Sequence, residues 1–268
     1  MVDIIEVNNA SASAKITLQG AHVFHYARKG EKGLLWLSDI SDFEVGKAIR
    51  GGVPVCWPSF GMNNPDLPQH GFSRTAMFDH VSTLELDANT TEVILILKHS
   101  EATLTVWPYK FELELKVTVS DKLTMELTTT NLDDKTFKIT QALHSYFPVS
   151  HISDAKIKGL DKKPFLDALT KREEVQNGDI IIEEEVDRVY QEVDAEILLI
   201  DKDRTISINN EGSSSVVVWN PWIEKGKRMS AMRDEAYNDF VCIESANAFD
   251  DFVDIKPSFS HTLKAVIA

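Results

Sequence analysis

The sequence has little cysteine and no long apolar run. Its 268 residues include two cysteines, Cys56 and Cys242, each inside an apolar stretch. Two cysteines are too few for a disulfide framework or a zinc site, so we interpret them as reduced, buried thiols. The longest apolar runs, such as residues 93–97, are far too short to cross a bilayer. The first residues, MVDIIEVNNA, lack a basic stretch followed by an apolar one, which favours a cytoplasmic protein.

Positive charge is also in short supply. The chain has 28 Lys and Arg residues against 42 Asp and Glu residues, a formal net charge of −14. Such a surface repels nucleic acid and anionic membranes, so we expect neither as a partner. It would also repel a phosphorylated ligand, although screening limits that repulsion to about 8 Å at physiological salt. A phosphate site therefore needs specific basic side chains of its own.

Several catalytic signatures are absent. The sequence has no glycine-rich nucleotide loop, no G-x-S-x-G and no H-E-x-x-H. His22 and His25 are three residues apart in an expected strand, so their side chains point to opposite faces. The following histidines have no partner at the spacing of metal ligands: His80, His99, His151 and His261. We therefore expect no metal and no nucleotide cofactor.

The dominant pattern is an alternation of apolar and polar residues. Residues 111–119, FELELKVTV, place their apolar side chains on one face, which predicts a half-buried antiparallel strand. Ser120 and Asp121 form a turn that leads into LTMELTTT, so we expect a hairpin. Two more hairpins are expected over residues 83–97 and 197–208. Further strands are expected at residues 4–7, 15–18, 216–219, 240–244 and 261–267.

Helical periodicity is scarce, and we expect a turn or two of helix only within residues 164–169 and 231–238. Many short strands separated by turns predict an all-β protein, a large antiparallel β-sandwich or barrel. No linker, repeat or shift in composition divides the chain, so we expect one domain over residues 1–268.

Two segments interrupt the rhythm of strands, residues 49–75 and 219–232. Long irregular stretches in a compact domain are usually functional loops. The first is rich in glycine and proline and presents a set of side chains suited to binding: Arg50, Trp57, Gln69, His70 and Arg74. Arginine matches phosphate oxygens with two parallel hydrogen bonds, and tryptophan offers a flat surface for a sugar ring. The alternative is a structural loop with surface arginines; two arginines with Gln and His favour a pocket.

A histidine and a carboxylate stand in two later strands. In QALHSYFPV, His144 shares a face with Tyr146, and a lone strand histidine of this kind is more often structural than catalytic. In DFVCIESAN, Glu244 shares a face with Cys242. A buried carboxylate is costly unless it is paired or its raised pKa is useful, and the alternative is that Glu244 reaches solvent at the end of its strand. The residues alone do not decide between these roles.

Taken together, these segments resemble the aldose 1-epimerase superfamily, in particular its hexose-6-phosphate mutarotase branch, the glucose-6-phosphate 1-epimerases. The resemblance rests on IRGGVPVCWPSFG followed by LPQHGFSR, ALHSYF, VDRVY, VWNPW and CIESAN, in that order. It extends from about Gly20 to the C-terminus, and the first block with its HGFSR tail is the most specific part. It implies a single-domain β-sandwich of the galactose-mutarotase type, whose concave sheet face holds a sugar.

The resemblance also implies roles for individual residues. His144 would be the catalytic histidine and Glu244 the catalytic carboxylate. The substrate would be bound by Arg50, Gln69 and Arg74, with the arginines near the phosphate, while Asp187 would hold sugar hydroxyls and His70 would line the site. CIES stands where many relatives have a proline after the glutamate, which affects the shape of the loop rather than the chemistry.

The expected reaction is the interconversion of α and β anomers of a hexose 6-phosphate, most simply glucose 6-phosphate. We expect Glu244 to act as base at O1 and protonated His144 to act as acid at O5, because both groups can be tuned to titrate near neutrality. Two alternatives are a mutarotase of unphosphorylated aldoses and a non-catalytic sugar-binding or regulatory protein on the same fold. A scaffold role would leave the arginines unexplained. The acidic surface is consistent with a monomer.

Overall fold

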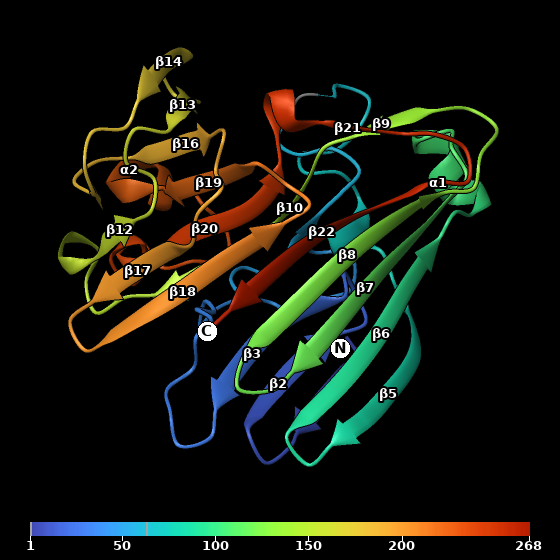
Figure 1. Cartoon of the computed structure of the whole chain (residues 1–268), viewed down its shortest axis with the longest axis horizontal. Helices are drawn as coiled ribbons and strands as arrows, with labels where there is room; N and C mark the ends of the chain where they lie inside the picture. The colour runs from blue at the N-terminus through green and yellow to red at the C-terminus, as the bar shows by residue number, and fades with distance from the viewer. Residues whose placement is uncertain (1, 63) are drawn as a thin grey trace.

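The computed structural model describes residues 2–62 and 64–268, and β-strands dominate it (Figure 1). The larger sheet is antiparallel and, in the described part of the chain, has nine strands in the order β15 (Ile180–Ile181), β12 (Lys156–Lys158), β17 (Ile197–Asp201), β18 (Arg204–Glu211), β22 (Ser260–Ile267), β8 (Leu123–Asn131), β7 (Phe111–Val119), β6 (Thr90–Lys98) and β5 (Asp79–Asp87). Figure 1 shows β22, β8, β7, β6 and β5 side by side in this sheet.

The second large sheet is also antiparallel. Its order among the described strands is β14 (Arg172–Val175), β13 (Pro164–Asp167), β16 (Val186–Tyr190), β19 (Ser215–Asn220), β20 (Phe240–Asn247), β10 (Gln141–Leu143) and β4 (Val55–Cys56). A further strand, β11 (Tyr146–Pro148), also pairs with β20. The centre of this sheet is therefore β20, which holds β19 on one side and both β10 and β11 on the other.

Smaller elements complete the fold. Two small sheets consist of β1 (Ile4–Asn8), β2 (Ala12–Thr17) and β3 (His22–Arg28), and of β9 (Phe137–Ile139) and β21 (Val253–Ile255). The described helices are short: α1 (Glu101–Val106), α2 (Trp222–Gly226) and the 3-10 turns η1 (Ser73–Thr75), η2 (Ile152–Asp154), η3 (Ala236–Asn238) and η4 (Phe249–Asp251). None of the helices in the described residues is long and apolar enough to span a membrane.

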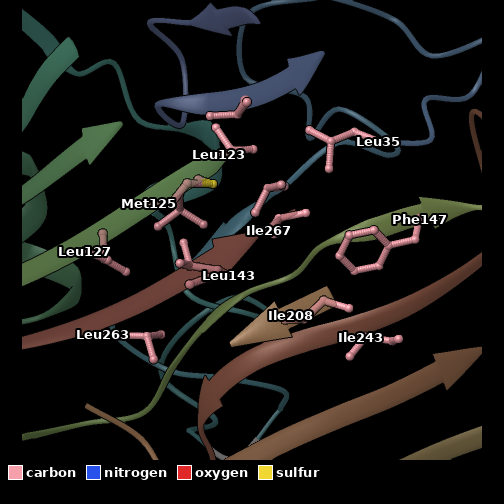
Figure 2. Packing of buried hydrophobic residues seen from close by; sticks show 14 of the residues in the cluster. Leu35, Leu123, Met125, Leu127, Leu143, Phe147, Ile208, Ile243, Leu263 and Ile267 are labelled. Carbon is pink, nitrogen blue, oxygen red and sulfur yellow. The ribbon is translucent and has the colours of Figure 1, made fainter. Parts of the chain in front are cut away.

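The main core lies between the two large sheets. Leu123, Met125 and Leu127 of β8 face Ile243 of β20 and Phe147 of β11 across it (Figure 2). In β7 and β8 buried and partly exposed residues alternate along the whole strand, which confirms the period of two seen in the sequence. The burial of these apolar side chains supplies the main stabilisation of the sandwich.

The second large sheet is covered on both faces, as the burial of its central strand β20 shows. Every residue of β20 is buried. Val241 and Ile243 belong to the main core, whereas Cys242 and Ala246 belong to a second apolar cluster on the opposite face. Side chains that alternate with the core residues of β20 therefore point away from the main core, and Glu244 is one of them.

The three expected hairpins and the further strands are confirmed, with ends that differ by a few residues. The helical expectation for residues 164–169 is wrong, because residues 164–167 form β13 and pair with β14 and β16. Asp167 then closes a turn by accepting hydrogen bonds from the amides of Leu169 and Thr170. Cross-strand pairing thus outweighs the weak helical pattern. In the other segment, only its end forms the helical turn η3, while α1 and α2 were not predicted.

Candidate active site

A cavity of about 970 Å³ opens on the face of the second large sheet that points away from the main core. Side chains of β16, β19 and β20 form one part of its wall, and both irregular segments of the sequence contribute another part, together with residues outside them such as Lys47, His144 and Lys171. The structure brings together, in this one cavity, all but one of the site residues predicted from the sequence: Arg50, Gln69, His70, Arg74, His144, Asp187 and Glu244. The exception is Trp57.

His144 and Glu244 are in direct contact in the cavity wall. His144 Nε2 lies 3.3 Å from Glu244 Oε1. His144 stands between β10 and β11, where its amide donates a hydrogen bond to the carbonyl of Pro54. Glu244 is in the middle of β20 and only 1% exposed, so it does not reach solvent at a strand end. Its Oε2 atom is buried and has no hydrogen-bond partner in the described part of the chain.

Burial shifts the pKa values of this pair in opposite directions. The pKa of Glu244 is raised well above its ordinary value, mainly by burial and further by the negative charge of Asp187. The pKa of His144 is lowered well below its ordinary value, mainly by burial, with contributions from His70 and the two arginines of the cavity. Both effects disfavour charge. The pair therefore tends to hold one proton, with the carboxyl group and the imidazole both neutral.

Aromatic rings fix the orientation of His144. Its ring stacks on Tyr146, with centroids 5.0 Å apart and an angle of 15° between the planes. On its other side Tyr146 stacks on Trp36 at 5.8 Å. Trp219 approaches His144 edge-on at 5.9 Å and itself lines the cavity. Sequence reasoning assigned no role to Trp219, although it lies in the VWNPW block, because its strand pattern alone does not show which face meets a ligand.

The HGFSR segment, residues 70–74, forms a tight turn that carries Arg74, whereas Arg50 comes from the start of the same irregular segment. Gly71 has a positive φ of 72°, and a Cβ atom there would lie 2.0 Å from the carbonyl oxygen of Trp57, so only glycine fits. Arg74 Nη2 donates to the carbonyl of Gln69 at 2.7 Å. Arg50 Nη1 donates to the Tyr146 hydroxyl at 3.4 Å. The two guanidinium groups are therefore held by the chain before any ligand arrives.

His70, in the same turn, is held by contacts within the protein. Its Nδ1 atom accepts a hydrogen bond from the amide of Gly61, and its ring packs against Phe60 and, at 5.7 Å, against His144. The pKa of His70 is lowered to about 3, mainly by burial and to a smaller extent by the positive charges of Arg74 and Arg50. His70 is thus a neutral side chain at neutral pH, which lines the cavity beside His144.

The prediction that Trp57 offers its ring to a sugar is wrong. Trp57 is fully buried in the main core, where its ring contacts Phe111 at 4.5 Å and Trp107 at 5.0 Å. Its indole Nε1 donates a hydrogen bond to Thr129 Oγ1 at 2.9 Å. The direction of a side chain in an irregular segment cannot be read from spacing. In this case, the flat aromatic surface beside the cavity belongs to Trp219.

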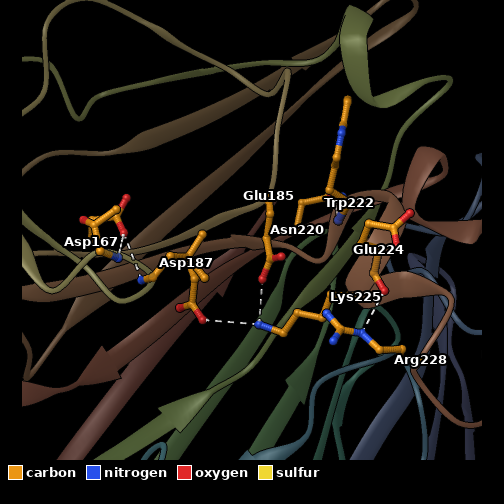
Figure 3. A network of polar contacts seen from close by, with 10 residues as sticks. Asp167, Glu185, Asp187, Asn220, Trp222, Glu224, Lys225 and Arg228 are labelled. Atoms are coloured by element: carbon orange, nitrogen blue, oxygen red, sulfur yellow. Dashed lines mark hydrogen bonds and ion pairs between the residues drawn. The ribbon is translucent and has the colours of Figure 1, made fainter.

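Asp187 lies on β16, lines the same cavity and is paired with a lysine that sequence reasoning missed. Lys225 of α2 places its Nζ atom 3.7 Å from Asp187 Oδ2 and 3.1 Å from Glu185 Oε1 (Figure 3). Further basic residues line the same cavity: Lys47, Lys171 and Arg228. The cavity thus concentrates positive charge in a chain whose net charge is −14.

The fold and the cavity define a galactose-mutarotase-like β-sandwich with a histidine–carboxylate pair in the cavity of its second large sheet. The arrangement matches the structure of a galactose mutarotase related enzyme from Lactobacillus acidophilus with a TM-score of 0.79, over 99% of this chain and 97% of that one, at 15% identity. That similarity concerns the fold. The family model of aldose 1-epimerase matches residues 3–267, and the chain therefore belongs to the aldose 1-epimerase family.

Two relatives with a common name cover most of the chain. A protein of Cenchrus ciliaris is 37% identical over 256 residues, 91% of this chain and 77% of its own length. One of Salmonella typhimurium is 35% identical over 264 residues, 96% of this chain and 88% of its own. Both are named "Putative glucose-6-phosphate 1-epimerase". The crystal structure of a "putative mutarotase" from Salmonella typhimurium has a TM-score of 0.93 at 34% identity, covering 100% of this chain and 90% of that one.

Proposed function

We propose that this protein interconverts the α and β anomers of a hexose 6-phosphate, with glucose 6-phosphate as the expected substrate. The observation that carries the proposal is the 3.3 Å contact between His144 Nε2 and Glu244 Oε1 inside a cavity that also presents Arg50 and Arg74. A sugar needs an acid and a base at adjacent oxygens, and a phosphate needs guanidinium groups. The family and the relatives' names support the same reaction and substrate.

The reaction requires two proton transfers and no redox step. Glu244 removes the proton from the O1 hydroxyl, the C1–O1 bond becomes a carbonyl, and the C1–O5 bond breaks. O5 takes its proton from His144. Rotation about the C1–C2 bond presents the other carbonyl face. As the ring closes, His144 takes back the proton from the O5 hydroxyl, the C1–O5 bond re-forms, and Glu244 returns its proton to O1. A buried carboxylate of raised pKa is a stronger base, and an imidazolium of lowered pKa is a stronger acid, so the charged pair, once formed, is more reactive than the free groups.

The phosphate has a second effect in this scheme. The charges of Arg50 and Arg74 contribute to the lowered pKa of His144. A phosphate dianion bound by the same arginines offsets those charges, so His144 holds its proton more readily when the substrate is phosphorylated. Before binding, the shared proton rests on Glu244, because burial disfavours both charged forms. Transfer of that proton across the 3.3 Å contact then gives the reactive ion pair.

An NMR exchange experiment tests this function. The rates of α/β exchange are compared for glucose 6-phosphate, galactose 6-phosphate and glucose, with and without the protein. We expect the largest acceleration for glucose 6-phosphate. Acceleration of glucose alone would instead identify a mutarotase of free aldoses, and binding without any acceleration would identify a non-catalytic sugar-binding protein. Either result would overturn the proposal.

A further inference from the structure

Lys225 lines the cavity and lies near Glu185, Asp187 and Trp219, although the reaction scheme above does not use it. It is part of α2, in the second irregular segment of the sequence. Its Nζ atom lies 3.1 Å from Glu185 Oε1, 3.7 Å from Asp187 Oδ2 and 5.7 Å from the centroid of the Trp219 ring. Figure 3 shows the lysine side chain between the two carboxylates. The ammonium group is thus already engaged by two anions.

Asp187 is in an unfavourable place for a carboxylate. Burial raises its pKa, and the charge of Glu185 raises it further, whereas Lys225 is the strongest charge that acts against this. The negative charge of Asp187 also contributes to the raised pKa of Glu244, so the two carboxyl groups interact electrostatically. The titratable groups that face Asp187 from the surrounding elements are Lys225, Glu185, Lys171, Glu244 and Cys242.

The strand register links this carboxylate to the catalytic pair. Asp187 of β16 lies opposite Trp219 of β19, and Val217 of β19 lies opposite Glu244 of β20. Asp187, Trp219 and Glu244 all line the same cavity. A group that orients both Asp187 and Trp219 therefore acts on the surface against which a sugar ring would lie.

We propose that Lys225 is a positioning residue for the sugar ring: its ammonium group holds Asp187 and lies over Trp219, so that the two side chains together orient the pyranose above His144 and Glu244. The inference rests on the proposed function of this cavity. It assigns Lys225 to the ring rather than to the phosphate, because two carboxylates already neutralise its charge. Loss of Lys225 should then affect phosphorylated and free sugars alike.

Lys225→Met tests this assignment kinetically. We expect kcat/KM for glucose 6-phosphate and for glucose to fall by a similar factor of about tenfold, the scale of one charge-assisted hydrogen bond. Lys225→Arg keeps the charge and should recover most of the activity. Lys227→Met is the matched control, because Lys227 is two residues away, exposed, and paired only with Glu224 among the contacts of its ammonium that we observe. A loss confined to the phosphorylated sugar would overturn the proposal and make Lys225 a phosphate ligand.

A titration without any sugar separates this inference from the proposed function. The side-chain carboxyl carbons of aspartate are labelled with ¹³C, and the Asp187 signal is assigned with Asp187→Asn. We expect Lys225→Met to raise the pKa of Asp187 and Lys227→Met to leave it unchanged. An unchanged Asp187 titration in folded Lys225→Met would overturn the positioning role, whether or not the protein accelerates anomer exchange. If the wild-type protein fails to accelerate exchange while the titration shifts as expected, the proposed function fails and the control of Asp187 by Lys225 stands without it.

Discussion

At the scale of single residues, burial turns two ordinary side chains into an acid–base pair. His144 and Glu244 are a hundred residues apart in the sequence and 3.3 Å apart in the cavity. Neither would be notable in water, where a glutamate carboxyl group is ionised and an imidazole is partly protonated near neutrality. Burial raises the pKa of Glu244 and lowers that of His144, so each becomes a better proton-transfer group than its free form.

Removal of either member of the pair should abolish most of the catalysis. General acid–base groups typically contribute about 10²–10⁴-fold, so Glu244→Gln and His144→Asn should each slow the catalysed anomer exchange by that factor. Glu244→Gln is nearly isosteric, whereas His144→Asn is smaller and removes the ring that stacks on Tyr146, so circular dichroism is used to confirm that both variants keep the wild-type fold. Magnetisation-transfer NMR on glucose 6-phosphate measures the rate. Full activity in either variant would contradict the assignment.

Arg74 should determine the preference for a phosphate rather than the chemical step. A charge-assisted contact contributes about 1.5–3 kcal/mol, so Arg74→Ala should raise the KM for glucose 6-phosphate by about 10- to 100-fold. Turnover of free glucose should change much less, because glucose has no group for this arginine. Steady-state kinetics on both sugars check the prediction. Equal effects on the two substrates would argue against a phosphate site at Arg74.

At the scale of elements, the irregular segment from Ile49 to Thr75 serves two opposite purposes. Its polar side chains Arg50, Gln69 and Arg74 enter the cavity, while Trp57 enters the main core. Gly71 packs closely against the carbonyl of Trp57, so the turn that carries Gln69 and Arg74 is attached to the core residue Trp57. The cavity wall is therefore anchored in the same core that holds the two sheets together.

Trp57→Phe should weaken the fold without weakening substrate binding. The change removes the hydrogen bond to Thr129 and leaves a small void among packed aromatic rings, a loss of about 1–3 kcal/mol of unfolding free energy. Urea denaturation measures this loss, and the KM for glucose 6-phosphate should stay at the wild-type value. Trp219→Leu is the contrasting variant, since Trp219 lines the cavity and its loss should raise KM. A raised KM in Trp57→Phe would restore a sugar-binding role for that residue.

At the scale of the whole molecule, charge is distributed unevenly. The chain as a whole carries −14, yet its large cavity contains several lysines and arginines. An anionic substrate is repelled at a distance and attracted within about 8 Å, the range that screening allows at physiological salt. The expected monomer, the cytoplasmic location, the single domain and the absence of nucleic-acid partners stay predictions.

Stability of the whole protein should depend on the pH through buried neutral histidines. His22 in β3 is buried, its Nε2 donates to the Gly51 carbonyl at 2.8 Å, and burial lowers its pKa to about 4. The unfolded chain binds the proton near pH 6.5 and the folded chain only near pH 4. The contribution of neutral His22 to the unfolding free energy is therefore fully present above pH 6.5 and is lost as the pH falls toward 4. The total loss is about 3 kcal/mol.

The variant His22→Gln isolates this contribution, because glutamine offers a similar amide donor that does not titrate. Urea unfolding of wild type and His22→Gln at pH 7, 5.5 and 4.5 gives the difference between their unfolding free energies. We expect this difference to shift in favour of His22→Gln as the pH falls. Parallel losses in the two proteins would show that His22 is not responsible.

Strand content and hairpins could be predicted from the sequence, because alternation is a local property of neighbouring residues. The pattern in residues 111–119 reappears residue by residue in the burial of β7. The same local reasoning failed for β13, whose conformation is decided by its partners β14 and β16. It failed for Trp57 as well, because the direction of a side chain in an irregular segment depends on distant contacts.

The sequence by itself determined the sandwich, the family and the residue types of the site, since these depend on alternation and on short motifs that can be read along the chain. The tertiary structure alone decided which of those residues meet, that Trp219 rather than Trp57 borders the cavity, and that Lys225 joins Asp187. It also decided the pKa values of His144 and Glu244. Burial and distance between residues far apart in the chain exist only after folding, and these quantities govern proton transfer.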